Sequence, residues 1–179
     1  MAIRKITMDW IIDNYMEYFQ QFQLKEEDIR NHYEDWKSGK EVVLPKDYLW
    51  YLFQLIVQAI AKQATSEAHM YRKNVEVYSK MWEFLVKVEN RNGTHVLRSK
   101  FLNELRLWKV ESTIYKKQVE IISGHCCPYC DNLDKKIMSI DEALETQPLA
   151  SKQCTRKWGC NCCYSETFAR DSEGRLIKL

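Results

Sequence analysis

The sequence predicts a mainly α fold: a helical bundle with long antiparallel helices, followed by a small, loop-rich, cysteine-rich C-terminal module. Two observations support the helical part. The 179 residues include only three prolines and five glycines, so few positions interrupt a helix. Apolar side chains also recur in steps of three and four, which places them on one helical face. The module is predicted from the cysteines, because all seven lie between Cys126 and Cys163.

Two long helices are predicted in the middle of the chain, around residues 66–90 and 96–122. They are expected to turn at Asn92-Gly93, the strongest break before Ile122, and to pack against each other. The seam of the first helix consists of Tyr71, Val75, Tyr78, Trp82 and Leu85. The seam of the second consists of Phe101, Leu105, Trp108, Ser112, Tyr115, Val119 and Ile122, with Ser112 as its polar member.

Shorter helices are predicted in the first third of the chain. One apolar stripe runs from Trp10 to Phe19, and a second covers Leu24 to Trp36. Pro45 is typical of the first turn of a third helix. The apolar part of that helix, Tyr48 to Ala61, is about 14 residues long. A membrane span needs roughly 20 residues, so a buried helix is expected instead.

A domain boundary is predicted at Gly124, because helical periodicity stops there. Residues 1–124 form the expected helical domain, and residues 125–179 form the cysteine-rich module. The first part carries 19 basic and 17 acidic side chains and the second carries 8 of each, for a net charge of +2. Neither part has the charge excess of a strong nucleic-acid or membrane-surface binder. The run from Ser139 to Glu142 has the form of a capping box, so one short helix is expected inside the module.

The distribution of the cysteines favours a local metal site over a disulfide framework. Disulfides usually hold a whole small domain together, whereas the first 125 residues contain no cysteine. The number of cysteines is odd, and no export signal is visible because Asp9, Asp13 and Glu17 interrupt the N-terminal stretch. We therefore expect a reducing, cytoplasmic environment.

The segment Cys127-Pro128-Tyr129-Cys130 has the spacing of one half of a zinc site. Zinc prefers four soft ligands in a tetrahedron, usually as two pairs separated by a loop. The second half is supplied by Cys154, Cys160, Cys162 and Cys163. Spacing alone leaves two assignments open: Cys160 with Cys163, or Cys154 with Cys160 or Cys162. His125 is a further candidate that could replace one sulfur.

Other uses of the cysteines remain as alternatives. Cys127 and Cys130 could form a redox-active dithiol, although the preceding sequence is helical and a thioredoxin-type motif lies in a βαβ context. Disulfides, an iron–sulfur cluster and a catalytic metal are the others. A catalytic zinc usually has histidine or carboxylate ligands and one open position, so an all-sulfur set favours a structural zinc.

The stretch His125–Asp134, HCCPYCDNLD, resembles the "CPxCxxLDG" segment near the C-terminus of phage Mu F-like head-morphogenesis proteins. In that family a later "CRC" completes a presumed zinc site, and Cys160-Asn161-Cys162 resembles it here. A long helix leads into the segment in the family, and residues 114–122 would be that helix in this chain. The resemblance covers roughly residues 100–165. This chain departs from the pattern at Lys135, where the family has glycine, and at Asn161, where it has arginine.

The resemblance implies a ligand pool and a role. The pool, from which four members are expected to bind zinc, is Cys127, Cys130, Cys154, Cys160 and Cys162. Cys126 and Cys163 are then extra. The implied role is that of a non-enzymatic minor head component, which associates with portal or capsid proteins and assists assembly or genome packaging.

Two alternatives to this role come from the residues themselves. One is a zinc-dependent nucleic-acid-binding protein, since basic side chains flank the proposed site at Lys135, Lys136, Lys152, Arg156 and Lys157. The other is a redox protein that uses Cys127 and Cys130. No glycine-rich phosphate loop or nucleophile elbow is present, so an enzyme is not expected.

Overall fold

A computed structural model describes residues 6–125 and 127–179 of the chain. The chain forms two compact units, Met1–Gln63 and Ala64–Leu179, which are described separately below. The cysteine-rich segment belongs to the second unit together with residues 64–124. The boundary at Gly124 marks a change in sequence character, and a separately folding module beyond it stays a prediction.

The first unit is built from three helices, α1 (Met8–Gln20), α2 (Glu26–Lys37) and α3 (Pro45–Gln63). The predicted short helices and the helix beginning at Pro45 are therefore confirmed. The core of the unit is formed by the apolar faces of these helices, which bury Ile11, Phe19, Ile29, Tyr48, Leu49, Phe53 and Ile56. Among the residues that the structure describes, no helix combines the length and apolar content needed to cross a bilayer.

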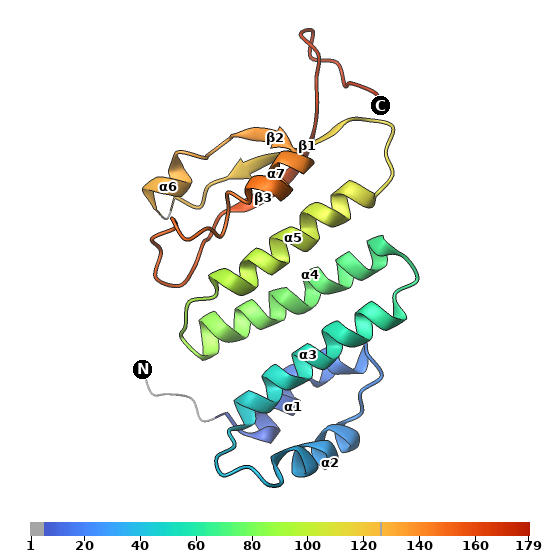
Figure 1. The fold of residues 1–179 in the computed structure, drawn as a ribbon, viewed down its shortest axis with the longest axis vertical. Coiled ribbons are helices and arrows are strands. Elements are labelled where there is room, and N and C mark those ends of the chain that lie inside the picture. The colour runs from blue at the N-terminus through green and yellow to red at the C-terminus, as the bar shows by residue number, and fades with distance from the viewer. Residues whose placement is uncertain (1–5, 126) are drawn as a thin grey trace. The chain divides into compact units, whose positions relative to one another are not determined.

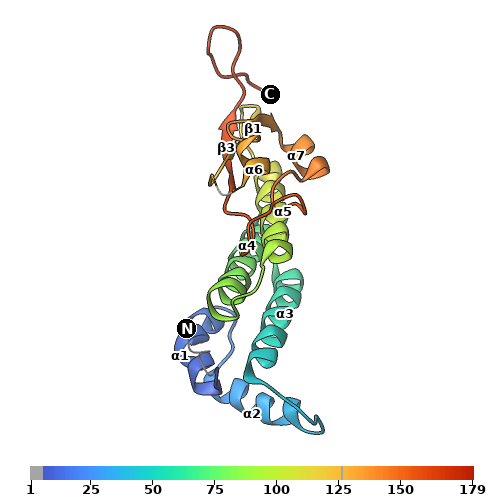
Figure 2. The same ribbon diagram turned by 90° about the vertical axis from the view of Figure 1, so that its left-hand side faces the viewer.

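Helices also begin the second unit, with α4 (Glu67–Glu83), a π-helical turn η1 (Phe84–Val88) and α5 (Thr94–Val110). Helices α4 and α5 lie side by side in both views (Figures 1 and 2) and pack against each other. A hydrogen bond of 3.1 Å from Asn74 Nδ2 to Asn103 Oδ1 joins them. The turn between the two helices falls at residues 89–93, as the Asn92-Gly93 break predicts.

The prediction that the second helix continues to Ile122 is wrong, because α5 ends at Val110. Serine and threonine hydroxyls can compete for nearby backbone groups, so Ser112 and Thr113 disfavour a helix. The Thr113 hydroxyl accepts a hydrogen bond of 3.2 Å from the amide of Tyr115. In the following residues Val119 and Ile121 are buried on either side of a less buried Glu120, and three side chains are β-branched, so the segment forms a strand.

That strand, β1 (Lys117–Ile122), is the centre of a small sheet that the sequence analysis did not predict. It lies between β2 (Ile137–Ser139) and β3 (Cys163–Phe168), and both pairings are antiparallel. Val119 pairs with Met138, and Ile121 pairs with Tyr164. These four side chains are buried, so one face of the sheet contributes to the core of the unit. The module is consequently less loop-rich than expected.

Two short helices complete the module, α6 (Pro128–Asp131) and α7 (Ile140–Thr146). The predicted cap of α7 is confirmed, since the Ser139 hydroxyl accepts a hydrogen bond of 3.0 Å from the Glu142 amide. Helix α5 contacts α4, α7 and β3, and α7 contacts β1 and β2. The core between them contains Leu97, Phe101, Leu105, Val119, Ile121, Met138, Tyr164 and four of the cysteines. The protein is thus mainly helical, with a three-stranded sheet and a cysteine-rich C-terminal region.

Candidate metal centre

Five cysteine sulfurs come together in the second unit and could hold a metal ion. They form two groups of three that share Cys130, and the sulfurs within each group lie within 4.8 Å of one another. One group consists of Cys127, Cys130 and Cys154, and the other consists of Cys130, Cys160 and Cys162. These are the five members of the ligand pool that the family resemblance implies.

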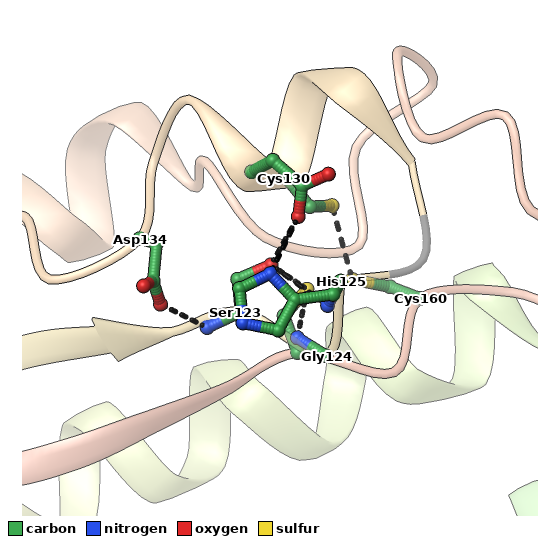
Figure 3. A network of polar contacts seen from close by, with 8 residues as sticks. Ser123, Gly124, His125, Cys130, Asp134 and Cys160 are labelled. Atoms are coloured by element: carbon green, nitrogen blue, oxygen red, sulfur yellow. Dashed lines mark hydrogen bonds and ion pairs between the residues drawn. The ribbon is translucent and has the colours of Figure 1, made fainter.

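Two of the sulfur–sulfur distances match the edge of a tetrahedral thiolate site. A zinc–sulfur bond of about 2.3 Å requires neighbouring sulfurs about 3.8 Å apart in a regular tetrahedron. The Sγ atoms of Cys127 and Cys154 are 3.8 Å apart, and those of Cys130 and Cys160 are 3.7 Å apart. Figure 3 shows the contact between Cys130 and Cys160. A disulfide would bring two sulfurs to about 2.05 Å, and the cysteines that the structure describes are free thiols. The donor set therefore suits a soft ion such as zinc.

The sulfurs come from two separate segments. Cys127 immediately precedes the one-turn helix α6, and Cys130 lies within it. Cys154, Cys160 and Cys162 lie in the irregular segment between α7 and β3. Because neither segment alone brings four sulfurs together, the site depends on the fold of the whole module.

A network of hydrogen bonds holds the end of β1 against the Cys127–Cys130 turn (Figure 3). The Ser123 amide donates to Asp134 Oδ1 at 2.8 Å, and the Ser123 hydroxyl donates to Asp131 Oδ1 at 3.0 Å. Both carboxylates follow Cys130 closely in the sequence. They therefore tie the turn that carries Cys130 to the end of β1.

Gly124 brings the chain close enough for its amide to face a sulfur. Its N–H donates to Cys162 Sγ at 3.4 Å. A Cβ atom at this position would lie 2.7 Å from the carbonyl oxygen of Asn161, which is closer than side-chain carbons approach backbone oxygens. The absence of a side chain therefore permits the contact between the end of β1 and the segment that carries Cys162.

Lys135 occupies the backbone position where the resembling family has glycine. Its φ of +60° lies in the left-handed region, which favours glycine over other residues. Its amide donates to the Ile121 carbonyl at 2.8 Å, and the Lys136 carbonyl accepts from the Ile121 amide at 3.0 Å. The turn after Asp134 thus continues the backbone pairing with β1 and needs a positive φ to do so.

The sulfurs differ in how readily they carry charge. Burial alone would raise the pKa of Cys127, but the backbone amides of Cys130 and Thr155 and the neighbouring thiols outweigh it and lower the pKa to about 7. At Cys162 burial is likewise outweighed, chiefly by the Gly124 amide, and the pKa is lowered. Hydrogen-bond donors that favour a thiolate also suit a metal ligand.

Burial dominates at the two innermost sulfurs. It raises the pKa of Cys160 to about 12, and it raises the pKa of Cys130 further, with added contributions from Cys127 and Cys162. Both side chains are at most 1% exposed. A thiolate at either position is therefore unfavourable unless a cation lies beside it.

The structure separates the remaining candidates from the cluster. Cys163 is exposed at the start of β3 and belongs to neither group of sulfurs, so the pairing of Cys160 with Cys163 that spacing allowed is not assembled. His125 is exposed and its Nδ1 lies 3.1 Å from Asp131 Oδ1 instead. Cys126, an expected extra, lies outside the described residues.

The segment between Cys154 and Cys160 also contacts the turn that precedes α5. Asn92 Nδ2 donates to the Lys157 carbonyl at 3.1 Å, and the Gly93 amide donates to the Trp158 carbonyl at 3.4 Å. The Asn92-Gly93 break therefore has two roles, since it turns the chain between helices and supports the second half of the sulfur cluster.

Sequence reasoning missed the polar residues that surround the cluster: Ser123, Gly124, Asp131 and Asp134. A signal for the two aspartates was present, because carboxylates that follow a C-x-x-C turn can accept hydrogen bonds from a neighbouring segment. Ser123 and Gly124 could not be found this way, since the segment before them was predicted to be helical.

No family model, curated protein sequence or solved structure matches this chain in comparisons. The argument for function consequently depends on the residues and geometry of the cluster.

The left-handed backbone at Lys135 gives a testable prediction for stability. Lys135→Gly should raise the free energy of unfolding by roughly 0.5–1 kcal/mol, because it removes the strain of a Cβ at positive φ. Urea unfolding of the two proteins measures the difference. Lys136→Gly is the matched control and should lower stability, because Lys136 does not have a positive φ. Equal effects of the two substitutions would contradict this explanation.

The buried thiols predict how the metal-free protein responds to pH. In the folded protein the pKa values of Cys160 and Cys130 are raised. Above about pH 8.5 these thiols therefore lose their protons in the unfolded chain but keep them in the folded one, so the free energy of unfolding falls. Cys127 acts in the opposite sense, since its lowered pKa stabilises the fold above about pH 8.5 and this contribution is lost as pH falls through about 7.

The measurement is the urea midpoint of reduced, chelator-treated protein at pH 8 and pH 10. The midpoint should be lower at pH 10, and Cys160→Ser should show a smaller decline. A decline of the same size in this variant would show that other groups cause it.

Proposed function

We propose that the five-sulfur cluster holds zinc as a structural ion. The observation that carries this proposal is the approach of sulfurs from two distant segments to 3.7–3.8 Å without a covalent bond between them. Zinc would relieve the burial cost at Cys130 and Cys160, because a divalent cation favours the thiolate form. Four of the five sulfurs would complete its tetrahedron.

A structural ion fits the cluster better than a catalytic one. Among the described residues, the side-chain groups that could hold a metal consist of cysteine sulfurs alone. Four of these cysteines are at most 5% exposed: Cys127, Cys130, Cys160 and Cys162. A catalytic zinc needs an open position that substrate can reach. In this proposal zinc stabilises the module, and α4 and α5 form the antiparallel hairpin on which the module is built.

We further propose that the protein is a non-enzymatic assembly component that resembles phage Mu F-like head-morphogenesis proteins. Support comes from the stretch that resembles the family motif and from Lys135, the position at which this chain departs from it. Asp134 accepts the Ser123 amide, and Lys135 adopts the backbone conformation for which the family's glycine is suited. The partners would be portal or capsid proteins, met in the cytoplasm or in the phage particle.

The alternatives differ in support. The lowered pKa of Cys127 favours a redox-active Cys127–Cys130 dithiol. Against it, Cys130 Sγ also contacts Cys160 Sγ, as a shared ligand would. Nucleic-acid binding through the basic residues near the cluster stays a prediction, and steep weakening with added salt would identify it.

Zinc binding is tested by metal analysis of protein purified without chelator. We expect about one zinc per chain, and chelation should remove it and lower the urea midpoint of the protein. Elemental mass spectrometry and circular dichroism provide the two readouts. Cys130→Ser should abolish zinc retention, whereas the matched variant Cys163→Ser should keep it. Protein that carries no zinc and unfolds normally would overturn the proposal.

The assembly role is tested by co-expression with the structural genes that neighbour the coding sequence, followed by affinity capture. We expect capture of a portal-like protein at a fixed ratio, and the interaction should survive the Cys163→Ser substitution. Failure to capture any folded neighbour would contradict the assembly role while leaving zinc binding intact.

A further inference from the structure

The cluster contains one more sulfur than a tetrahedral zinc ion can bind. Cys130, Cys160 and Cys162 form the buried group, with exposures of 0%, 1% and 3%. They can supply three of the four positions. The fourth ligand must come from the other group, which offers both Cys127 and Cys154. These two sulfurs are in contact at 3.8 Å, so one can replace the other with little movement.

We propose that Cys127 and Cys154 form an oxidation site, at which a disulfide between them removes the fourth zinc ligand and releases the ion. This inference rests on the zinc binding proposed above. It adds a regulation of the same site, with hydroperoxides as the class of oxidant.

Access to solvent differs between the two sulfurs and sets the order of reaction. Cys154 is partly exposed, whereas Cys127 is 5% exposed. Cys154 also lies in an irregular segment, where its amide donates a turn hydrogen bond of 3.2 Å to the Ser151 carbonyl. A sulfur in such a segment can move the roughly 1.8 Å that separates contact from a disulfide of about 2.05 Å.

The chemistry proceeds in two balanced steps. The Cys154 thiolate attacks one oxygen of hydrogen peroxide, the O–O bond breaks, and a sulfenic acid and hydroxide form. The Cys127 thiolate, which would hold zinc in the reduced protein, then attacks the Cys154 sulfur, the S–O bond breaks, and a second hydroxide departs. Protonation gives two water molecules overall. Two electrons pass from the two sulfurs to the peroxide, and a dithiol reductant reverses the change.

The remaining sulfurs explain why zinc would be lost. After oxidation only Cys130, Cys160 and Cys162 remain as thiols in the cluster. The groups of candidate ligands in the described part of the chain then offer no fourth sulfur. A structural zinc site needs four ligands to be closed. Cys130 and Cys160 also touch at 3.7 Å, but their burial keeps peroxide away from them.

The test treats the zinc-loaded full chain with hydrogen peroxide and follows zinc release with a colorimetric chelator. Wild type should release its zinc, and peptide mass spectrometry should find one disulfide, between Cys127 and Cys154. Cys154→Ser should still retain about one zinc per chain, because Cys127 remains as the fourth ligand, but it should release the ion at least tenfold more slowly. Cys163→Ser, which removes an exposed thiol outside the cluster, should behave as wild type, and dithiothreitol should restore zinc binding.

Three results would overturn the inference: loss of zinc binding in reduced Cys154→Ser, zinc release from this variant at the wild-type rate, or a disulfide between other cysteines. In each case wild type still binds zinc, so the proposed function stands. Wild-type protein that binds no zinc before oxidation would remove both proposals.

Discussion

The C-terminal part of the structure depends on one constraint, the contact of sulfur atoms from two segments around Cys130. Cys130 is fully buried and belongs to both groups of sulfurs. The cysteines are also part of the apolar core that joins α5, the sheet and α7. Thiols at these positions pack as small apolar groups, whereas thiolates would need a cation. The cluster can therefore pack as part of the apolar core while its sulfurs are protonated, and it needs a cation once they are thiolates.

The surrounding polar groups are arranged to hold this contact. Asp131 and Asp134 fix Ser123, and Gly124 then presents its amide to Cys162. The end of β1 thereby connects the first pair of cysteines to the second set. On the other side, the segment before Cys160 rests on the turn at Asn92-Gly93, so the cluster also reaches the helices of its unit.

The C-x-x-C turn and the later cysteines could be recognised from the sequence because ligand spacing is local, whereas the choice of five cysteines came from the resemblance to the family motif. The helices up to Val110 and the cap at Ser139 were predictable for similar reasons, since periodicity and capping act over a few residues. The strand β1 was not, because Tyr115, Val119 and Ile122 also fit a helical spacing. Its identity is determined by pairing with β2 and β3, which are distant in sequence.

The choice among the sulfurs shows the same limit. Spacing allowed Cys163 to pair with Cys160, because this pair and the pair Cys127–Cys130 each have two intervening residues. In the structure β3 begins at Cys163, and the alternation of a strand places neighbouring side chains on opposite faces. Tyr164 is buried and Cys163 is exposed, so the strand removes Cys163 from the cluster.

X-ray absorption at the zinc edge of the purified, reduced protein tests the central claim most directly, because it reports the atoms bound to the ion. The account predicts a single shell of four sulfur ligands at about 2.3 Å. A shell that contains nitrogen or oxygen ligands in place of two or more sulfurs would contradict it, as would protein without zinc.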